Sequence, residues 1–396
     1  MKILIITHFA GDFSASDNGR FLHLAKKLAE NHDVEIITTE FLHAAKAMKK
    51  PIEVEYSFRV TMLKEPGYKK NVCLRRFYSH YIWGKNLKTY LETIEKPDVV
   101  YCAIPSLTGP NFVARYCRKN QIRFVIDVQD LWPEAFEMVL NVPVVSSIVF
   151  YPFKKLADSI YRSADDICAV SKTYVDRALS VNNKCEKGTT VFLGTNLDTF
   201  DAYAKGKSVM QKQAEDIWIA YCGTLGSSYD LTCVFDALDI LSKKQIRPTF
   251  VVMGDGPRRQ EFEQYASKRN ISVRFTGNLP YNQMCALLCK CDITVNPITH
   301  NAAGSIINKH GDYAASGLPV VSTQENEEYR ALVEKYKMGF NCKNNDAEDL
   351  AKKFEQLITD EQLRKKMGTN ARRCAEEMFD RKNSYASLLR AIIKER

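Results

Sequence analysis

Buried strands that alternate with helices constrain the fold of this chain more than any other feature. Lys2–Thr7 is a continuous apolar run, which is typical of a parallel strand covered on both faces. Apolar residues then recur at helical spacing from Phe21 to Ala29, and Val34–Thr38 is the next strand. Further strands are expected at 99–103, 124–128 and 167–170. This alternation predicts a doubly wound α/β domain.

The alternation stops at Leu193–Asp216, a polar stretch that we interpret as an interdomain linker, and then starts again. At 396 residues the chain is long enough for two domains. We therefore expect two doubly wound, Rossmann-like domains, namely residues 1–196 (completed by a C-terminal helix at 379–396) and residues 197–378. Ligands of such sheets bind at the carboxyl ends of the strands, so a cleft between the two domains is the expected site.

Composition argues against several classes of protein. The chain is 45% hydrophobic and 26% charged, which is ordinary for a soluble globular protein. No run of about 18 apolar residues would cross a membrane, and Met1–Thr7 has the length of a strand rather than of a signal peptide. The twelve cysteines include no Cys-x-x-Cys motif, which fits reduced thiols and a cytoplasmic location. A zinc site at Cys285, Cys289 and Cys291 would lack a nearby fourth ligand.

Positive charge is concentrated in residues 41–90, which hold eleven Lys and Arg against three Glu in a chain of net charge +9. Aromatic residues are interleaved with these cations. Such a segment suits nucleic acid, an anionic membrane surface, or solvent alone. No nucleic-acid-binding motif accompanies it, so we favour peripheral association with an anionic membrane. The apolar stretch Met138–Phe153 is too short to span a bilayer; it is either part of the same surface or a buried core segment.

The stretch Gly304–Ser322 carries the strongest functional signal, because it reads as a loop, a short helix, a glycine stop and a buried strand. Lys309 and Asp312 lie three residues apart, so both project from one face of the helix. A cation and a carboxylate at a loop-to-helix junction suit a ligand that has phosphates and ribose hydroxyls. An ordinary surface ion pair is the alternative interpretation.

Glycine-containing loops follow other expected strands. Glycine allows close backbone approach, and the N-terminus of a following helix favours an anion. The chain has no Gly-x-Gly-x-x-Gly or Walker loop, which argues against dinucleotide and P-loop sites. It also has no Asp-x-Asp, so we expect no metal-held diphosphate. The loops are Asp17–Arg20, Tyr221–Gly226, Gly254–Pro257 and Phe275–Pro280.

Taken in order, five segments resemble the donor domain of retaining GT-B glycosyltransferases, in the large family of sucrose synthase-like and mannosyltransferase-like enzymes. The segments are Tyr221–Gly226, Met253–Pro257, Phe275–Pro280, Ala286–Asp292 and Asn308–Val321. In the N-terminal half, Asp127–Glu134 is similar to the Asp-Leu-Trp-Pro-Glu segment of certain bacterial enzymes. Those enzymes transfer amino sugars onto lipid-linked carriers for O-antigen and capsule.

The resemblance implies retaining transfer of a hexose or N-acetylhexosamine from a UDP-linked sugar to a lipid-linked acceptor, with neither metal nor cofactor. Among the catalytic residues, Lys309 would hold the diphosphate, Asp312 would bind the ribose, and Gln129 would bond a donor hydroxyl. Asp130 and Trp132 would lie on the acceptor side. The donor-binding residues would be Gly19, Arg20, Thr224, Gly254, Asn278, Leu279, Ser305, Ile307 and Asn308.

The chain departs from the family pattern at three positions. Gly304 stands where the family has a glutamate, Thr224 where it has an arginine, and Gln129 where it has a histidine. The family's nearby lysine is also missing from the stretch that ends at Tyr229. These departures keep open a non-catalytic subunit that binds a partner transferase. A transferase with a soluble or protein acceptor also stays open, as does a sugar-nucleotide epimerase.

Overall fold

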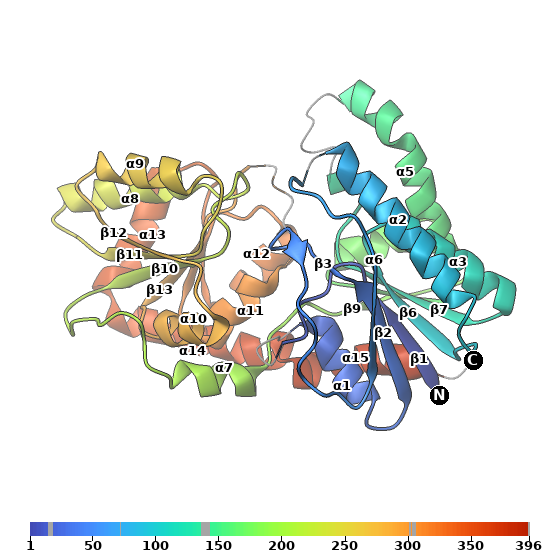
Figure 1. Ribbon diagram of the computed structural model, residues 1–396. Coiled ribbons are helices and arrows are strands. Elements are labelled where there is room, and N and C mark those ends of the chain that lie inside the picture. The colour runs from blue at the N-terminus through green and yellow to red at the C-terminus, as the bar shows by residue number, and fades with distance from the viewer. Residues whose placement is uncertain (15–18, 72, 136–142, 301, 303–305, 395–396) are drawn as a thin grey trace. The chain divides into compact units, whose positions relative to one another are not determined.

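The computed structural model describes residues 1–14, 19–71, 73–135, 143–300, 302 and 306–394 (Figure 1). It divides the chain into two compact units. Unit 1 comprises residues 1–191 together with the segment from Tyr385, and unit 2 comprises residues 192–384. Each unit has a parallel sheet with helices packed around it, as the alternating pattern predicts.

Unit 1 is built on a seven-stranded sheet in which neighbouring strands run parallel, in the order β5-β2-β1-β6-β7-β8-β9. Its edge strand β5 is not expected from the sequence, because its residues are only partly buried and so lack a continuous apolar pattern. A short hairpin, β3 (Phe41–Leu42) and β4 (Ala47–Met48), stands apart. The sheet strands are β1 (Lys2–Ile6), β2 (Asp33–Thr39), β5 (Arg59–Leu63), β6 (Val99–Ile104), β7 (Arg123–Val128), β8 (Asp166–Ala169) and β9 (Thr189–Thr190).

Helices cover both faces of this sheet (Figure 1). Helices α2 (Leu74–Leu91), α3 (Thr108–Asn120) and α5 (Pro143–Ser163) pack side by side on one face. On the other face, the core joins β1 and α1 (Arg20–Leu28) to the C-terminal helix α15 (Arg381–Ile393), where Ile3, Leu24 and Leu388 are fully buried. A further helix of unit 1 is α6 (Lys172–Leu179).

Unit 2 has a six-stranded parallel sheet in the order β12-β11-β10-β13-β14-β15. Its strands are β10 (Trp218–Cys222), β11 (Thr249–Met253), β12 (Ser272–Gly277), β13 (Ile293–Asn296), β14 (Val320–Ser322) and β15 (Gly339–Asn341). Its helices are α7 (Leu197–Ala204), α8 (Leu231–Lys243), α9 (Arg259–Ser267), α10 (Tyr281–Leu288), α11 (Asn308–Ala315), α12 (Glu327–Tyr336), α13 (Ala347–Thr359), α14 (Glu361–Cys374) and the π-helical turn η1 (Ala375–Phe379).

The stretch Leu193–Asp216 is only in part a linker. It contains α7, which packs against α10 and α11 of unit 2. Asn196 is typical of a loop, which favoured the interpretation of this stretch as a linker. In the structure it caps α7, because its side chain accepts a hydrogen bond from the backbone N–H of Thr199 at 3.0 Å. The backbone of Thr195 also pairs with Asp380. The borders of unit 2 therefore lie at 192 and 384 rather than at 197 and 378.

Candidate functional site

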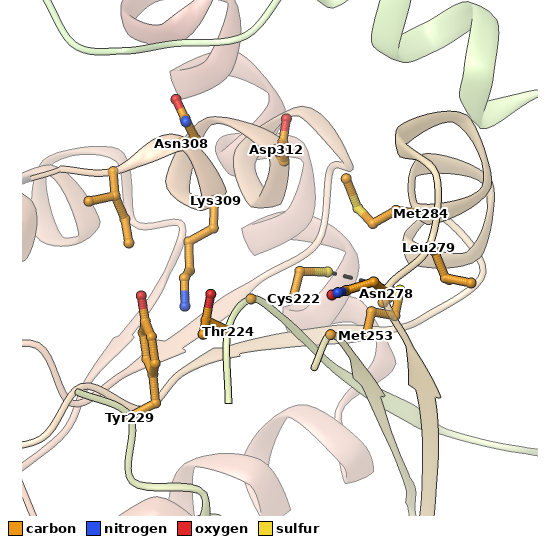
Figure 2. A pocket seen from close by; sticks show the side chains of 13 residues that line it. Cys222, Thr224, Tyr229, Met253, Asn278, Leu279, Met284, Asn308, Lys309 and Asp312 are labelled. Carbon is orange, nitrogen blue, oxygen red and sulfur yellow. Dashed lines mark hydrogen bonds between the residues drawn. The ribbon is translucent and has the colours of Figure 1, made fainter. Parts of the chain in front are cut away.

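A pocket of about 440 Å³ lies at the carboxyl edge of the unit 2 sheet (Figure 2). Its walls come from the residues that follow β10, β11 and β12 and from the first turns of α11. This is where parallel α/β sheets bind ligands. The pocket brings together eight of the residues that the resemblance assigns to the donor: Thr224, Gly254, Asn278, Leu279, Ile307, Asn308, Lys309 and Asp312.

Two glycines let the turns after β10 and β11 touch each other. Gly223 and Gly254 have φ angles of +148° and +156°, which side chains rarely allow. A Cβ atom on Gly254 would lie 1.9 Å from the carbonyl oxygen of Gly223. Any side chain at position 254 would therefore push the two turns apart and change the wall of the pocket.

The backbone at the start of α11 is fixed by His310, a residue that sequence reasoning missed. Nδ1 of His310 accepts a hydrogen bond from the N–H of Ile307 at 2.9 Å, so Nε2 carries the proton and donates to Gln324 Oε1 at 2.8 Å. Burial lowers the pKa of His310 to about 4, which keeps the ring neutral. The fixed loop holds the helix N-terminus at the pocket, where its N–H groups favour an anion.

Lys309 is a buried cation that has no hydrogen-bonding partner among the residues described. Its side chain lines the pocket, and Nζ lies 3.7 Å from the ring centre of Tyr229 and 4.5 Å from that of Tyr221. Burial lowers the pKa of Lys309 to about 7. Lys309 is 8% exposed and its amine has no partner among the described residues, so the alternative of an ordinary surface ion pair with Asp312 is wrong.

Asp312 also lines the pocket, but its carboxylate points away from the amine of Lys309 (Figure 2). Oδ1 accepts a hydrogen bond from the hydroxyl of Tyr281 at 2.8 Å, and that hydroxyl is 2.9 Å from Oγ1 of Thr195. Burial raises the pKa of Asp312. Tyr281 and Thr195 thus orient the carboxylate, and nothing in the local sequence indicated either partner.

In unit 1, Arg20 does not serve the role expected from the sequence. Its guanidinium donates two hydrogen bonds to Asp127, from Nε at 2.9 Å and from Nη2 at 3.1 Å. Nη1 donates to the carbonyl of Val191 at 3.1 Å. The Arg20 side chain is 3% exposed and that of Asp127 is fully buried. Arg20 is therefore a structural residue, and the expectation that it binds donor phosphate is wrong.

The other predicted residues of unit 1 gather at the carboxyl end of β7. The side-chain amide of Gln129 donates to Asp127 at 2.9 Å, and the indole N–H of Trp132 donates to Asp130 at 3.1 Å. Burial raises the pKa of Asp130. The guanidinium of Arg76 lies 4.6 Å from the ring centre of Trp132, which is itself buried. Roles for these residues toward a donor or an acceptor stay predictions.

Some predicted positions carry less information. Gly19 is the residue before the first turn of α1, and the rest of its loop, at 15–18, lies outside the described residues. Ser305 and Gly304 also lie outside them, as do residues 138–142 of the apolar stretch 138–153, whose remaining residues form the start of α5. Within the described residues, no group of three or more His, Cys, Asp or Glu side chains could hold a metal ion.

The basic segment 41–90 contains a helix with an exposed apolar stripe. Leu74, Tyr78 and Tyr81 of α2 are 87%, 57% and 48% exposed and follow one another at helical spacing. We call these three residues the α2 stripe. Exposed cations flank it at Lys69, Lys70, Arg75 and Lys85. No described helix is long and apolar enough to cross a membrane.

Comparison with known structures defines the class of fold. A sucrose-phosphate synthase from Thermosynechococcus elongatus matches with a TM-score of 0.73 at 15% identity, over 98% of this chain and 97% of that one. HepE from Anabaena, solved in complex with UDP, matches with a TM-score of 0.64 at 17% identity over 96% of both chains. The protein therefore has the GT-B fold, with two α/β units built on parallel sheets.

The sequence comparisons match part of the chain. Residues 205–374, which are less than half of the chain, match the family described as Glycosyl transferases group 1. An uncharacterized glycosyltransferase of Methanocaldococcus jannaschii is 23% identical over 233 residues, which are 59% of each chain. The chain therefore spans 59% of the length of that relative.

Proposed function

We propose that the protein is a retaining glycosyltransferase that uses a UDP-linked sugar. The single observation that carries this proposal is the buried amine of Lys309, which has no hydrogen-bonding partner among the described residues and lies in a pocket at the start of α11. An unpaired buried cation is costly, and an anionic ligand would remove that cost. A nucleoside diphosphate fits this pocket, because the helix N-terminus adds a second favourable contact for phosphate.

In this proposal the bond between the anomeric carbon of the sugar and the diphosphate breaks, and a bond to an acceptor hydroxyl forms on the same face. The hydroxyl proton passes to the leaving diphosphate. Lys309 and the first N–H groups of α11 would stabilise the charge that develops there. Asp312 would accept hydrogen bonds from the ribose, and Asn278 and Leu279 would lie beside the base. Positioning and electrostatic stabilisation would supply most of the rate enhancement.

A thermal-shift screen against nucleotides and nucleotide sugars tests the donor side directly. A ligand that binds only the folded state raises stability by RT ln(1 + [L]/Kd), so the preferred donor gives the largest shift. We expect UDP and UDP-sugars to raise the melting temperature of the unmodified protein and to lose that effect in Lys309→Ala. Equal shifts with all nucleotides, or none, would contradict the proposal.

We further propose a lipid-linked acceptor that is reached by docking of the α2 stripe on an anionic membrane. Aromatic side chains favour the membrane interface, and each nearby cation adds about 1 kcal/mol of attraction to anionic headgroups. Arg76 is 7% exposed and packs on rings, so it belongs to the core of unit 1 and not to this surface. The cations that could face lipid are Lys69, Lys70, Arg75 and Lys85.

Sedimentation with liposomes tests this second part. We expect binding to anionic liposomes at low salt and release by about 0.5 M NaCl, because screening shortens the reach of the attraction. Replacing Lys69, Lys70 and Arg75 with Ser should abolish sedimentation. The matched control replaces three exposed cations of unit 2, Lys205, Lys207 and Lys366, and should bind as before. Equal binding to neutral liposomes would refute electrostatic docking, and no binding at all would favour a soluble or protein acceptor.

The departures at Thr224 and Gly304 motivate one further candidate, a non-catalytic subunit that binds UDP and a partner transferase. Thr224 lines the pocket where the family resemblance would put an arginine, so less positive charge faces the diphosphate. UDP binding without turnover on any sugar would favour this candidate over the enzyme.

A further inference from the structure

The amine of Lys309 lies against two aromatic rings. Its distances to the ring centres of Tyr229 and Tyr221 are 3.7 Å and 4.5 Å. Gly223 closes a third side, because a Cβ atom there would be 3.1 Å from Nζ. None of these walls offers a carboxylate or a carbonyl oxygen to the amine within hydrogen-bonding distance. We call this space the tyrosine slot.

Both tyrosines are held in place by the fold. The hydroxyl of Tyr221 donates to the backbone carbonyl of Thr224 at 2.8 Å, and its side chain is fully buried. Tyr229 packs edge-on against Tyr221 with ring centres 5.5 Å apart, and its backbone pairs with Ile298 beyond β13. Tyr229 also lines the pocket. The ring of Tyr229 is therefore one of the walls that keep Nζ of Lys309 buried.

The slot acts on the charge of Lys309 in two opposite ways. Ring faces attract an ammonium group, which favours the protonated amine. The exclusion of water favours the neutral amine, and this effect is the larger, since burial lowers the pKa of Lys309 to about 7. The neutral amine is therefore well populated near neutral pH, and a dianion that binds in the pocket shifts the balance to the ammonium form.

Other titratable groups around α11 do not replace that ligand. The thiol of Cys222 is buried, and burial raises its pKa. Asp312 is bonded to Tyr281, and His310 is bonded to Gln324. Helices α7, α14 and η1, which pack against α11, bring charged groups that pair among themselves: Asp201, Arg372 and Glu376.

We propose that Tyr229 is a positioning residue that, with Tyr221, keeps the amine of Lys309 dry and without hydrogen bonds, so that binding of a diphosphate is coupled to uptake of one proton by Nζ. This inference rests on the proposed function, since it takes the ligand of the pocket to be a nucleoside diphosphate. The proton comes from the buffer and is released again when the nucleotide leaves. Alkaline pH therefore weakens the hold on the product.

Titration calorimetry at pH 8, in buffers of different ionisation enthalpy, counts the protons taken up when UDP binds. We expect the unmodified protein to take up about one proton, because a lysine with a pKa near 7 is about nine-tenths neutral at that pH. Lys309→Arg, whose guanidinium is always charged, is the matched control and should take up none. Inorganic pyrophosphate should give the same difference between the two proteins as UDP.

Two substitutions of Tyr229 separate the ring from the hydroxyl. Tyr229→Phe keeps the ring, so proton uptake should be unchanged. Tyr229→Ala admits water to Nζ, which raises the pKa of Lys309 toward that of a free lysine, and uptake at pH 8 should fall to nearly zero. A mere loss of packing would weaken binding without changing the number of protons.

The possible outcomes separate this inference from the proposed function. Binding of UDP without proton uptake by the unmodified protein overturns the inference and leaves the proposed function standing. Unchanged proton uptake in Tyr229→Ala also overturns the inference and leaves the proposed function standing. If Tyr229→Ala does not fold, Tyr229→Phe still tests the inference. Loss of proton uptake in Tyr229→Phe would refute the claim that the ring is sufficient without the hydroxyl. Failure of both UDP and pyrophosphate to bind overturns the inference and the proposed function together.

Discussion

Arg20 in unit 1 and Lys309 in unit 2 are buried cations in the first turn of a helix that follows a strand of a parallel sheet. They are 4% and 8% exposed. Arg20 is bonded to Asp127 and to the backbone, whereas the amine of Lys309 faces only rings and a pocket. From the sequence both residues look like ligands for phosphate. We therefore expect the partners of a buried charge, rather than its place in the motif, to distinguish a structural cation from a binding one.

The largest expected effect lies on the structural side of this comparison. Arg20→Met leaves the carboxylate of Asp127 buried without its partner, which should lower the free energy of unfolding by about 3–5 kcal/mol. Chemical denaturation measures this loss. Lys27→Met on the same helix is the control, because Lys27 is 47% exposed and its pair with Glu30 is a surface pair. If Arg20→Met lowers the free energy of unfolding no more than the control does, Arg20 is not the structural cation that we describe.

The next effect lies on the functional side. Lys309→Ala should reduce turnover by roughly tenfold to several hundredfold, because a charge-assisted hydrogen bond to the diphosphate contributes about 1.5–3 kcal/mol. The fold should survive, because no described residue depends on the amine for a hydrogen bond. Single-turnover kinetics measure the loss of turnover, and circular dichroism checks that the variant is folded. Near-normal turnover in a folded Lys309→Ala protein would contradict the proposal that Lys309 binds the diphosphate.

A smaller effect is expected at the other end of the pocket. Asp312→Asn should weaken binding of UDP by about tenfold, close to the cost of one hydrogen bond to a charged group. Binding of pyrophosphate, which has no ribose, should change little. Calorimetry with both ligands tests the role of Asp312. Equal weakening of both would mean that Asp312 acts on the pocket as a whole rather than on the ribose.

No effect is expected from metal removal. The chain has no Asp-x-Asp motif to hold a metal-bound diphosphate, so turnover should persist in EDTA. An activity assay with and without EDTA tests this, using a metal-dependent transferase as the positive control. Loss of activity in EDTA that Mg²⁺ or Mn²⁺ restores would overturn a mechanism in which Lys309 alone carries the positive charge.

The sequence predicts much of the pocket because the pocket follows from local patterns. Thr224, Gly254 and Asn278 each follow a strand of the unit 2 sheet, and parallel strands present their carboxyl ends at one edge of the sheet. Once the strands are recognised, these residues must converge. The order of the strands adds no further condition, since β10, β11 and β12 are neighbours in both sequence and sheet.

What the sequence does not predict depends on contacts between distant residues. Arg20 and Asp127 are 107 positions apart, and no local pattern indicates that they pair. Tyr229 reads as a loop residue until it is seen beside Lys309. Arg76 reads as part of a basic surface, yet it packs among the rings of Trp132, Phe9 and Tyr68. Charged residues are mostly exposed, and nothing in the sequence marks Arg20 and Arg76 as exceptions.

The membership of α15 in both units has a consequence for how the protein is made. Tyr385, Leu388 and Ile392 are fully buried in the core of unit 1, although they are synthesised after all of unit 2. Domains usually fold in the order in which they leave the ribosome. Here the unit that emerges first lacks part of its core until the whole of unit 2 has been synthesised. A stalled nascent chain would therefore present an unfinished apolar surface in unit 1 to chaperones, while unit 2 could already be folded.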